Sequence, residues 1–75
     1  MDLFDLYWLL KSPNKVSFYF EGKTQTVESA EAEGEIAVCF NGRWFRNREE
    51  FFAKSEIDGM LLTAIQSELY GFRVE

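Results

Sequence analysis

Residues 36–46 carry the strongest local constraint on the fold, a two-residue turn between two segments that suit β-strands. Asn41-Gly42 supplies the positive φ angles that both central positions of a type I′ turn require, and apolar residues alternate before it. A turn of two residues also fixes the register of the hairpin. The predicted pairs are Phe40 with Arg43, Cys39 with Trp44, Val38 with Phe45, and Ala37 with Arg46.

This register predicts one apolar face and one flatter face, because successive side chains of a strand point to opposite sides of the sheet. The core face carries Ile36, Val38, Phe40 and Phe45. The opposite face carries Ala37, Cys39, Trp44 and Arg46. The large Trp44 ring is therefore expected among small neighbours.

Residues 15–29 are predicted to form a second hairpin. Val16 and Phe18 belong to an alternating apolar strand that leads into a glycine-containing turn. Two turn positions, one residue apart, remain open, and both place Val27 on the face of Val16 and Phe18. The acidic segment 28–35 is predicted to be the loop that joins the two hairpins.

Residues 2–11 are predicted to form a short helix that ends before Pro13. The residues at helical spacing on its core face are Leu3, Leu6, Tyr7 and Leu10. Phe4 and Trp8 form a second apolar stripe, about 100–140° away around the helix. Two interpretations of this stripe remain open: the helix is buried deeply across the sheet, or Phe4 and Trp8 stay outside as a contact patch.

The C-terminal part is predicted to hold two helices. Asn47 is placed to cap the first of them, with Glu50 three residues later, and Phe51 and Phe52 anchor that helix to the sheet. Ser55 begins a break in the helical pattern.

The second helix is predicted over residues 60–69, with Gly71 as its C-terminal cap and residues 72–75 available as a short edge strand. Its buried side is expected to hold Leu61, Leu62, Ile65 and Leu69. Together the elements predict a single α+β domain over residues 1–75, in the order α-β-β-β-β-α-α. We expect a four-stranded antiparallel meander, with the helices on one face.

The composition lacks the side chains that most catalytic and metal sites use. The chain has no histidine and one cysteine, Cys39, which excludes a zinc site of the usual kind and an intrachain disulfide. A serine–lysine spacing at residues 12–15 is interrupted by a proline that makes a turn. Glu49 and Glu50 are adjacent on a helix and therefore face apart. We predict no catalysis, no cofactor and no metal.

The formal net charge is −5, which argues against duplex DNA or an anionic membrane as the partner. The apolar segment 3–10 is too short to span a bilayer, and Asp2 precedes it where a signal peptide has basic residues. A lone thiol without a targeting signal predicts a reducing, cytoplasmic location.

Residues 48–65, REEFFAKSEIDGMLLTAI, resemble a pattern seen in small uncharacterised proteins of Gram-positive bacteria and their phages. The matching residues are Glu49, Glu50, Phe51, Ile57, Asp58, Gly59, Leu62 and Ile65. Gln66 departs from the pattern, because such proteins often have Trp there. The resemblance implies an apolar helix followed by a closing strand and a bacterial or phage origin, and it implies no activity.

Residues 43–48 form the one locally basic stretch and interleave cations with rings. The candidate nucleic-acid contacts are Arg43, Trp44, Arg46 and Arg48. Such a combination suits single strands, because rings stack on bases and arginines hold phosphates. The competing interpretation keeps Phe45 in the core and lays Arg46 over the Trp44 ring.

The sequence therefore favours a non-catalytic protein-interaction domain that binds another protein or a second copy of itself. The candidate interface residues are Phe4, Trp8 and Trp44. One alternative is a binder of single-stranded nucleic acid. The other is an acidic inhibitor that mimics nucleic acid, in which phosphates are replaced by Glu28, Glu31, Glu33 and Glu35.

Overall fold

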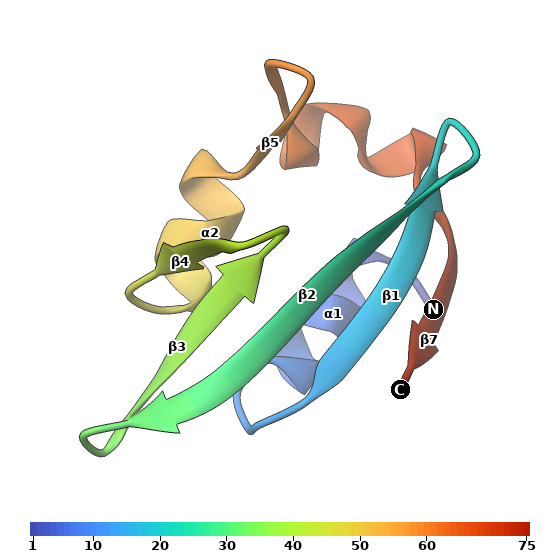
Figure 1. Ribbon diagram of the computed structural model, residues 1–75. Helices are drawn as coiled ribbons and strands as arrows, with labels where there is room; N and C mark the ends of the chain where they lie inside the picture. Colours follow the sequence, from blue (N-terminus) through green and yellow to red (C-terminus); the bar gives the residue numbers. More distant parts are fainter.

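The computed structural model describes residues 1–75 and contains one five-stranded antiparallel sheet (Figure 1). Its strands are β1 (Lys15–Phe20), β2 (Lys23–Ala32), β3 (Glu35–Phe40), β4 (Arg43–Phe45) and β7 (Tyr70–Val74). They lie in the order β4-β3-β2-β1-β7, so the first four form the predicted meander. The predicted α+β class is confirmed, and the sheet has a fifth strand, β7, where the sequence left residues 72–75 available for a short edge strand.

The β3–β4 hairpin has the predicted register over its three observed pairs. Asn41 and Gly42 have φ angles of 50° and 87°, as a type I′ turn requires. Phe40 pairs with Arg43, Cys39 with Trp44 and Val38 with Phe45. The expected fourth pair, Ala37 with Arg46, does not form because β4 ends at Phe45.

The predicted loop over residues 28–35 is wrong. Strand β2 continues to Ala32 and pairs with β3, with Ala30 opposite Ala37 and Ala32 opposite Glu35. A second two-residue turn makes this possible, because Glu33 and Gly34 have φ angles of 54° and 81°. The acidic segment therefore extends the sheet, although alanine and glutamate are not typical strand residues.

The predicted helix over residues 60–69 is confirmed only in part: a shorter helix is present, but residues 60–61 belong to a strand, and Leu61, which was predicted to be buried, is 43% exposed. Strands β5 (Glu56–Ile57) and β6 (Met60–Leu61) form a small hairpin, and a 3₁₀-helix, η1 (Leu62–Glu68), follows. The hairpin is closed by Asp58, whose φ angle is 52°, and by the glycine after it. A 3₁₀-helix has three residues per turn, so the i, i+3 spacing of Leu62 and Ile65 buries both side chains on one side.

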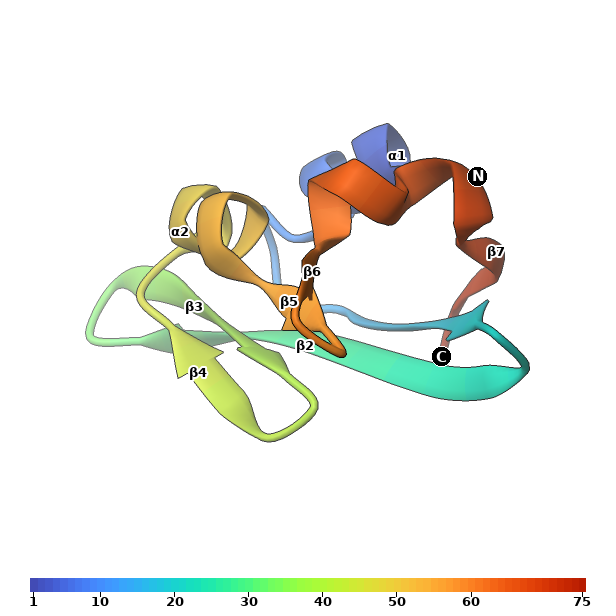
Figure 2. The same cartoon turned by 90° about the horizontal axis from the view of Figure 1, so that it is seen from above.

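Helices α1 (Leu3–Leu9), α2 (Arg48–Lys54) and η1 all cover the same face of the sheet, as Figure 2 shows. The Asn47 side chain caps α2 as predicted, accepting a hydrogen bond from the Glu50 backbone N–H at 2.8 Å. The buried core between the layers contains Leu3, Leu6, Leu10, Val16, Phe18, Phe20, Val27, Val38, Phe40, Phe45, Phe51, Ile57, Leu62, Ile65 and Leu69. The opposite face of the sheet carries no helix. The observed order differs from the predicted one, because the β5–β6 hairpin precedes the last helix, which is a 3₁₀-helix, and β7 follows it.

Gly71 was predicted to cap the last helix, but it lies within β7 under an aromatic ring. Tyr19 of β1 stacks on Tyr70 with ring centroids 5.6 Å apart. A Cβ atom on Gly71 would come within 2.6 Å of Cδ2 of Tyr19, and the φ angle at Gly71 is 68°. The edge strand therefore depends on a residue without a side chain.

We expect Gly71→Ala to lower the free energy of unfolding by about 2 kcal/mol, because strain from positive φ adds to the collision with Tyr19. Urea unfolding measures this loss. Gly22→Ala is the matched control: its φ angle is 76°, but no atom lies within 4 Å of the added Cβ. That control should lose about 1 kcal/mol. Equal losses would show that the ring contact has no effect.

Candidate interaction surface

Helix α1 turns two large rings toward solvent. Leu3, Leu6 and Leu10 form its buried face. Successive residues of an α-helix are rotated by about 100°, so Phe4 and Trp8 point away from that face. Phe4 is 68% exposed and Trp8 is 51% exposed. Of the two interpretations left open by the sequence, the structure supports an outward-facing stripe.

A shallow apolar groove of about 370 Å³ lies directly beside Phe4. It is lined by Leu3, Phe4, Tyr7, Phe52, Thr63 and Gln66, from α1, α2 and η1. The neighbouring rings contact edge to face, with centroid distances of 5.4 Å from Phe52 to Tyr7, 5.7 Å from Tyr7 to Trp8 and 6.2 Å from Trp8 to Phe4. We call Phe4, Tyr7, Trp8 and Phe52 the aromatic patch.

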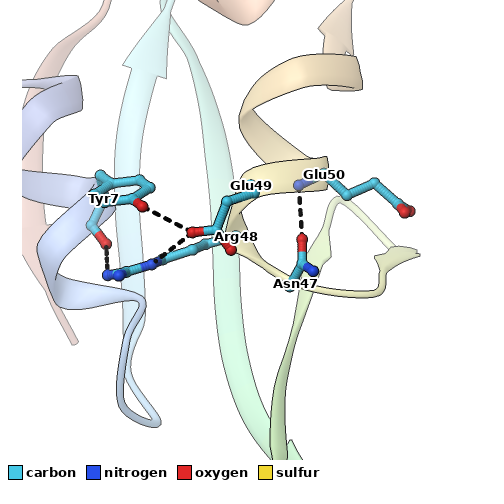
Figure 3. Close-up of polar contacts among 5 residues, drawn as sticks. All are labelled: Tyr7, Asn47, Arg48, Glu49 and Glu50. Atoms are coloured by element: carbon cyan, nitrogen blue, oxygen red, sulfur yellow. Dashed lines mark hydrogen bonds and ion pairs between the residues drawn. The ribbon is translucent and has the colours of Figure 1, made fainter.

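Arg48, at the start of α2, contacts both the backbone and the rings of α1 (Figure 3). Its Nη1 donates to the Tyr7 carbonyl oxygen at 2.9 Å, and its Nε donates to Oε2 of Glu49 at 3.1 Å. The guanidinium carbon lies 4.0 Å from the centroid of the Tyr7 ring and 5.6 Å from that of Trp8. Arg48 thus stacks against two rings of the aromatic patch and also bonds the helix backbone.

The Tyr7 hydroxyl completes this cluster by donating to Oε2 of Glu49 at 2.7 Å. This hydrogen bond lowers the pKa of the Glu49 carboxyl, with help from Arg48, and it raises the pKa of the Tyr7 phenol. At neutral pH the carboxyl is therefore ionised and the phenol protonated, the states that the hydrogen bond requires. The cluster therefore links helix α1 to helix α2 through hydrogen bonds.

We expect Tyr7→Phe to raise the pKa of Glu49 toward its ordinary value of 4.5, because the largest cause of the shift is removed. In the wild type the folded-state pKa lies below the unfolded one, so this contribution to stability is present above pH 4.5 and lost as the pH falls through the folded-state pKa. The variant should lose less stability on acidification. Carboxyl NMR titration checks the pKa, and Tyr70→Phe, which is remote from Glu49 in the fold, should leave it unchanged.

The four residues of the basic stretch do not share one surface. Trp44 is 59% exposed on the helix-free face of the sheet, but Arg43 lies with its guanidinium 4.9 Å from the Phe45 ring, on the covered side of β4. Arg46 pairs with Glu50 at 3.8 Å rather than covering Trp44, and Arg48 is engaged by α1. The structure thus separates Trp44 from the arginines that were expected to accompany it.

The acidic candidates are likewise dispersed. Glu28 pairs across the sheet with Cys39 and Glu31 with Ile36, so these two carboxylates point to opposite faces, while Glu33 lies in a turn. No group of three or more potential ligands is arranged to hold a metal ion. Cys39 is half-buried beside Trp44 and has no partner thiol.

A larger hollow of about 560 Å³ lies between the end of α1 and the start of α2. Its lining is mostly polar and mixes positive and negative side chains, among them Lys11, Glu35 and Arg46. The apolar groove beside Phe4 contrasts with it in having four hydrophobic residues among its six. The aromatic patch and its groove are therefore the surface best suited to bind another apolar surface.

Sequence reasoning placed Tyr7 and Phe52 in the core and did not associate Thr63 or Gln66 with a site. Tyr7 lies between the core face and the exposed stripe of α1, so its half-buried position follows from the helix geometry. The contribution of η1 could not be found in the same way, because its 3₁₀ geometry was not predicted.

None of the helices has the length and apolar character needed to cross a bilayer. A comparison with protein-family models finds no match for this chain, and comparisons with curated proteins and with solved structures find none either.

Proposed function

We propose that this chain is a non-catalytic protein-interaction domain and that its aromatic patch is the contact surface. The observation that carries this proposal is the exposure of Phe4 and Trp8 beside an apolar groove. Large exposed rings next to a depression are typical of interface centres, where aromatic side chains supply most of the binding free energy. The partner is a protein of the cytoplasm or a second copy of the chain.

The position of the rings supports contact over a role in folding. Fifteen hydrophobic residues already form the buried core, and neither Phe4 nor Trp8 belongs to it. Full burial of a large apolar side chain stabilises a fold by roughly 1.5–3 kcal/mol, and exposed rings do not contribute this free energy. Arg48 also stabilises the helix that presents them, so the patch is held in one orientation before a partner arrives.

Binding of single-stranded nucleic acid is the weaker candidate. Trp44 is available for stacking, but the arginines that would hold phosphates lie on other surfaces or pair with acidic residues. An acidic mimic is weaker still, because its glutamates form no row.

Photocrosslinking inside the native host tests the proposal. A photoreactive phenylalanine analogue replaces Phe4 in one variant and Trp44 in the other, and the two positions are comparably exposed on different faces. We expect protein adducts at position 4 and few or none at position 44. Equal adducts at both positions, or none at position 4, would contradict the proposal.

A further inference from the structure

We propose that the aromatic patch binds the same patch of a second copy, with the two α1 helices antiparallel around a two-fold axis. This inference rests on the proposed function and names its partner. Isologous dimers use one surface twice, so that surface must be complementary to itself. The patch meets this requirement because it has both a ridge, Phe4 and Trp8, and a groove.

The spacing along α1 brings the ridge and the groove together. Phe4 and Trp8 are one helical turn apart, so an axis midway between them sets Trp8 of each copy at the level of Phe4 of the other. At that level the groove is lined by Leu3, Phe4 and Tyr7. Trp8 of one copy therefore lies over the groove of the other, and both contacts form at once.

The charges on α1 also favour the antiparallel arrangement. Asp2 and Asp5 are exposed at the start of the helix, and Lys11 is exposed just beyond its end. Antiparallel packing sets the acidic start of each helix beside the basic end of the other, and it also opposes the two helix dipoles favourably. Parallel packing would place like charges together.

The size of the patch predicts a weak, reversible dimer. A fully enclosed aromatic side chain buries about 150–250 Å², so the exposed parts of the two rings contribute roughly 250 Å² per copy. With a polar rim the contact stays below the 800 Å² or so per partner of a standard interface. We therefore expect a dissociation constant between about 10 μM and 1 mM.

Sedimentation equilibrium from about 10 μM to 1 mM tests the inference, because this range brackets the expected dissociation constant. We expect the wild type to show a monomer–dimer equilibrium and Trp8→Ala to weaken it by about tenfold or more. Trp44→Ala is the matched control, since it removes a comparably exposed tryptophan from the other face. A wild type that is monomeric at the highest concentration, or equal losses in the two variants, would overturn the inference.

A charge reversal tests the antiparallel orientation. Lys11→Glu should weaken the dimer by about three- to tenfold, because each copy then places a carboxylate near Asp2 of the other. Lys23→Glu is the matched control, since it makes the same change of charge at an exposed position of β2. Equal dissociation constants for the two variants would overturn the antiparallel packing.

The two proposals fail in different ways. A protein that stays monomeric while position 4 crosslinks to a different protein would overturn the second copy as partner and leave the interaction domain standing. A protein that neither self-associates nor crosslinks at position 4 would overturn both. Adducts between two copies through position 4, together with dimers in solution, would support both.

Discussion

Phe51→Ala is expected to unfold the domain. Phe51 is fully buried, and its ring lies 5.4 Å from that of Phe40 and 5.7 Å from that of Phe45, so it joins α2 to the end of the sheet. Removing a buried phenylalanine side chain lowers the free energy of unfolding by about 3–5 kcal/mol, because it leaves a cavity. A core of this size supplies only about 3–5 kcal/mol in total.

Thermal and urea unfolding followed by circular dichroism measure this effect. We expect the Phe51→Ala variant to show no cooperative transition at 25 °C, or one shifted close to zero denaturant. Phe4→Ala is the matched control: it removes the same side chain from a helix position exposed to solvent. A Phe51→Ala variant that stays within about 1 kcal/mol of the wild type would contradict the packing described for α2.

Arg48→Ala is expected to destabilise the domain by releasing helix α1 from helix α2. The substitution removes a charged hydrogen bond to the Tyr7 carbonyl oxygen and the stacking against Tyr7 and Trp8. We expect the free energy of unfolding to fall by about 2 kcal/mol, mostly through release of α1. Amide hydrogen exchange should show this directly, with faster exchange at the Leu6 and Leu10 N–H groups than in the wild type.

Arg48→Lys separates charge from geometry in the same experiment. Lysine keeps the positive charge but has no planar fork to reach the Tyr7 carbonyl and the Glu49 carboxylate together. We expect it to recover less than half of the stability lost in the alanine variant. Full recovery would mean that only the charge matters, and an alanine variant as stable as the wild type would contradict the role given to Arg48.

The parts of the fold predicted correctly are those set by local chemistry. Asn41-Gly42 fixed both the turn and the β3–β4 register, and the leucine spacing of α1 identified its core face. The errors arose at two other turns that also have positive φ angles. Glu33-Gly34 forms a turn with positive φ at both residues, although Glu is not among the residues that usually favour such a turn. Asp58-Gly59, a pair that does favour it, was interpreted only as a break between two helices.

The candidate site was predicted only in part, for a different reason. Phe4 and Trp8 were recognised as a stripe apart from the core face, but periodicity cannot tell whether another element covers such a stripe. That depends on where α2 and η1 pack, and η1 was predicted as a regular helix. Arg48 was assigned to a nucleic-acid surface because its contact with Tyr7 joins residues 41 positions apart, which local patterns do not reveal.

We propose that Phe4 and Trp8 are exposed to solvent for contact with a partner and contribute little to the free energy of unfolding. The most direct test is to measure the free energy of unfolding of the Phe4→Ala/Trp8→Ala double variant together with its crosslinking and self-association. We predict a stability loss below about 1.5 kcal/mol, the size of an exposed aromatic pair, with association abolished. A loss of about 3 kcal/mol or more would place the rings in the core, and unchanged association would remove the patch as the contact surface.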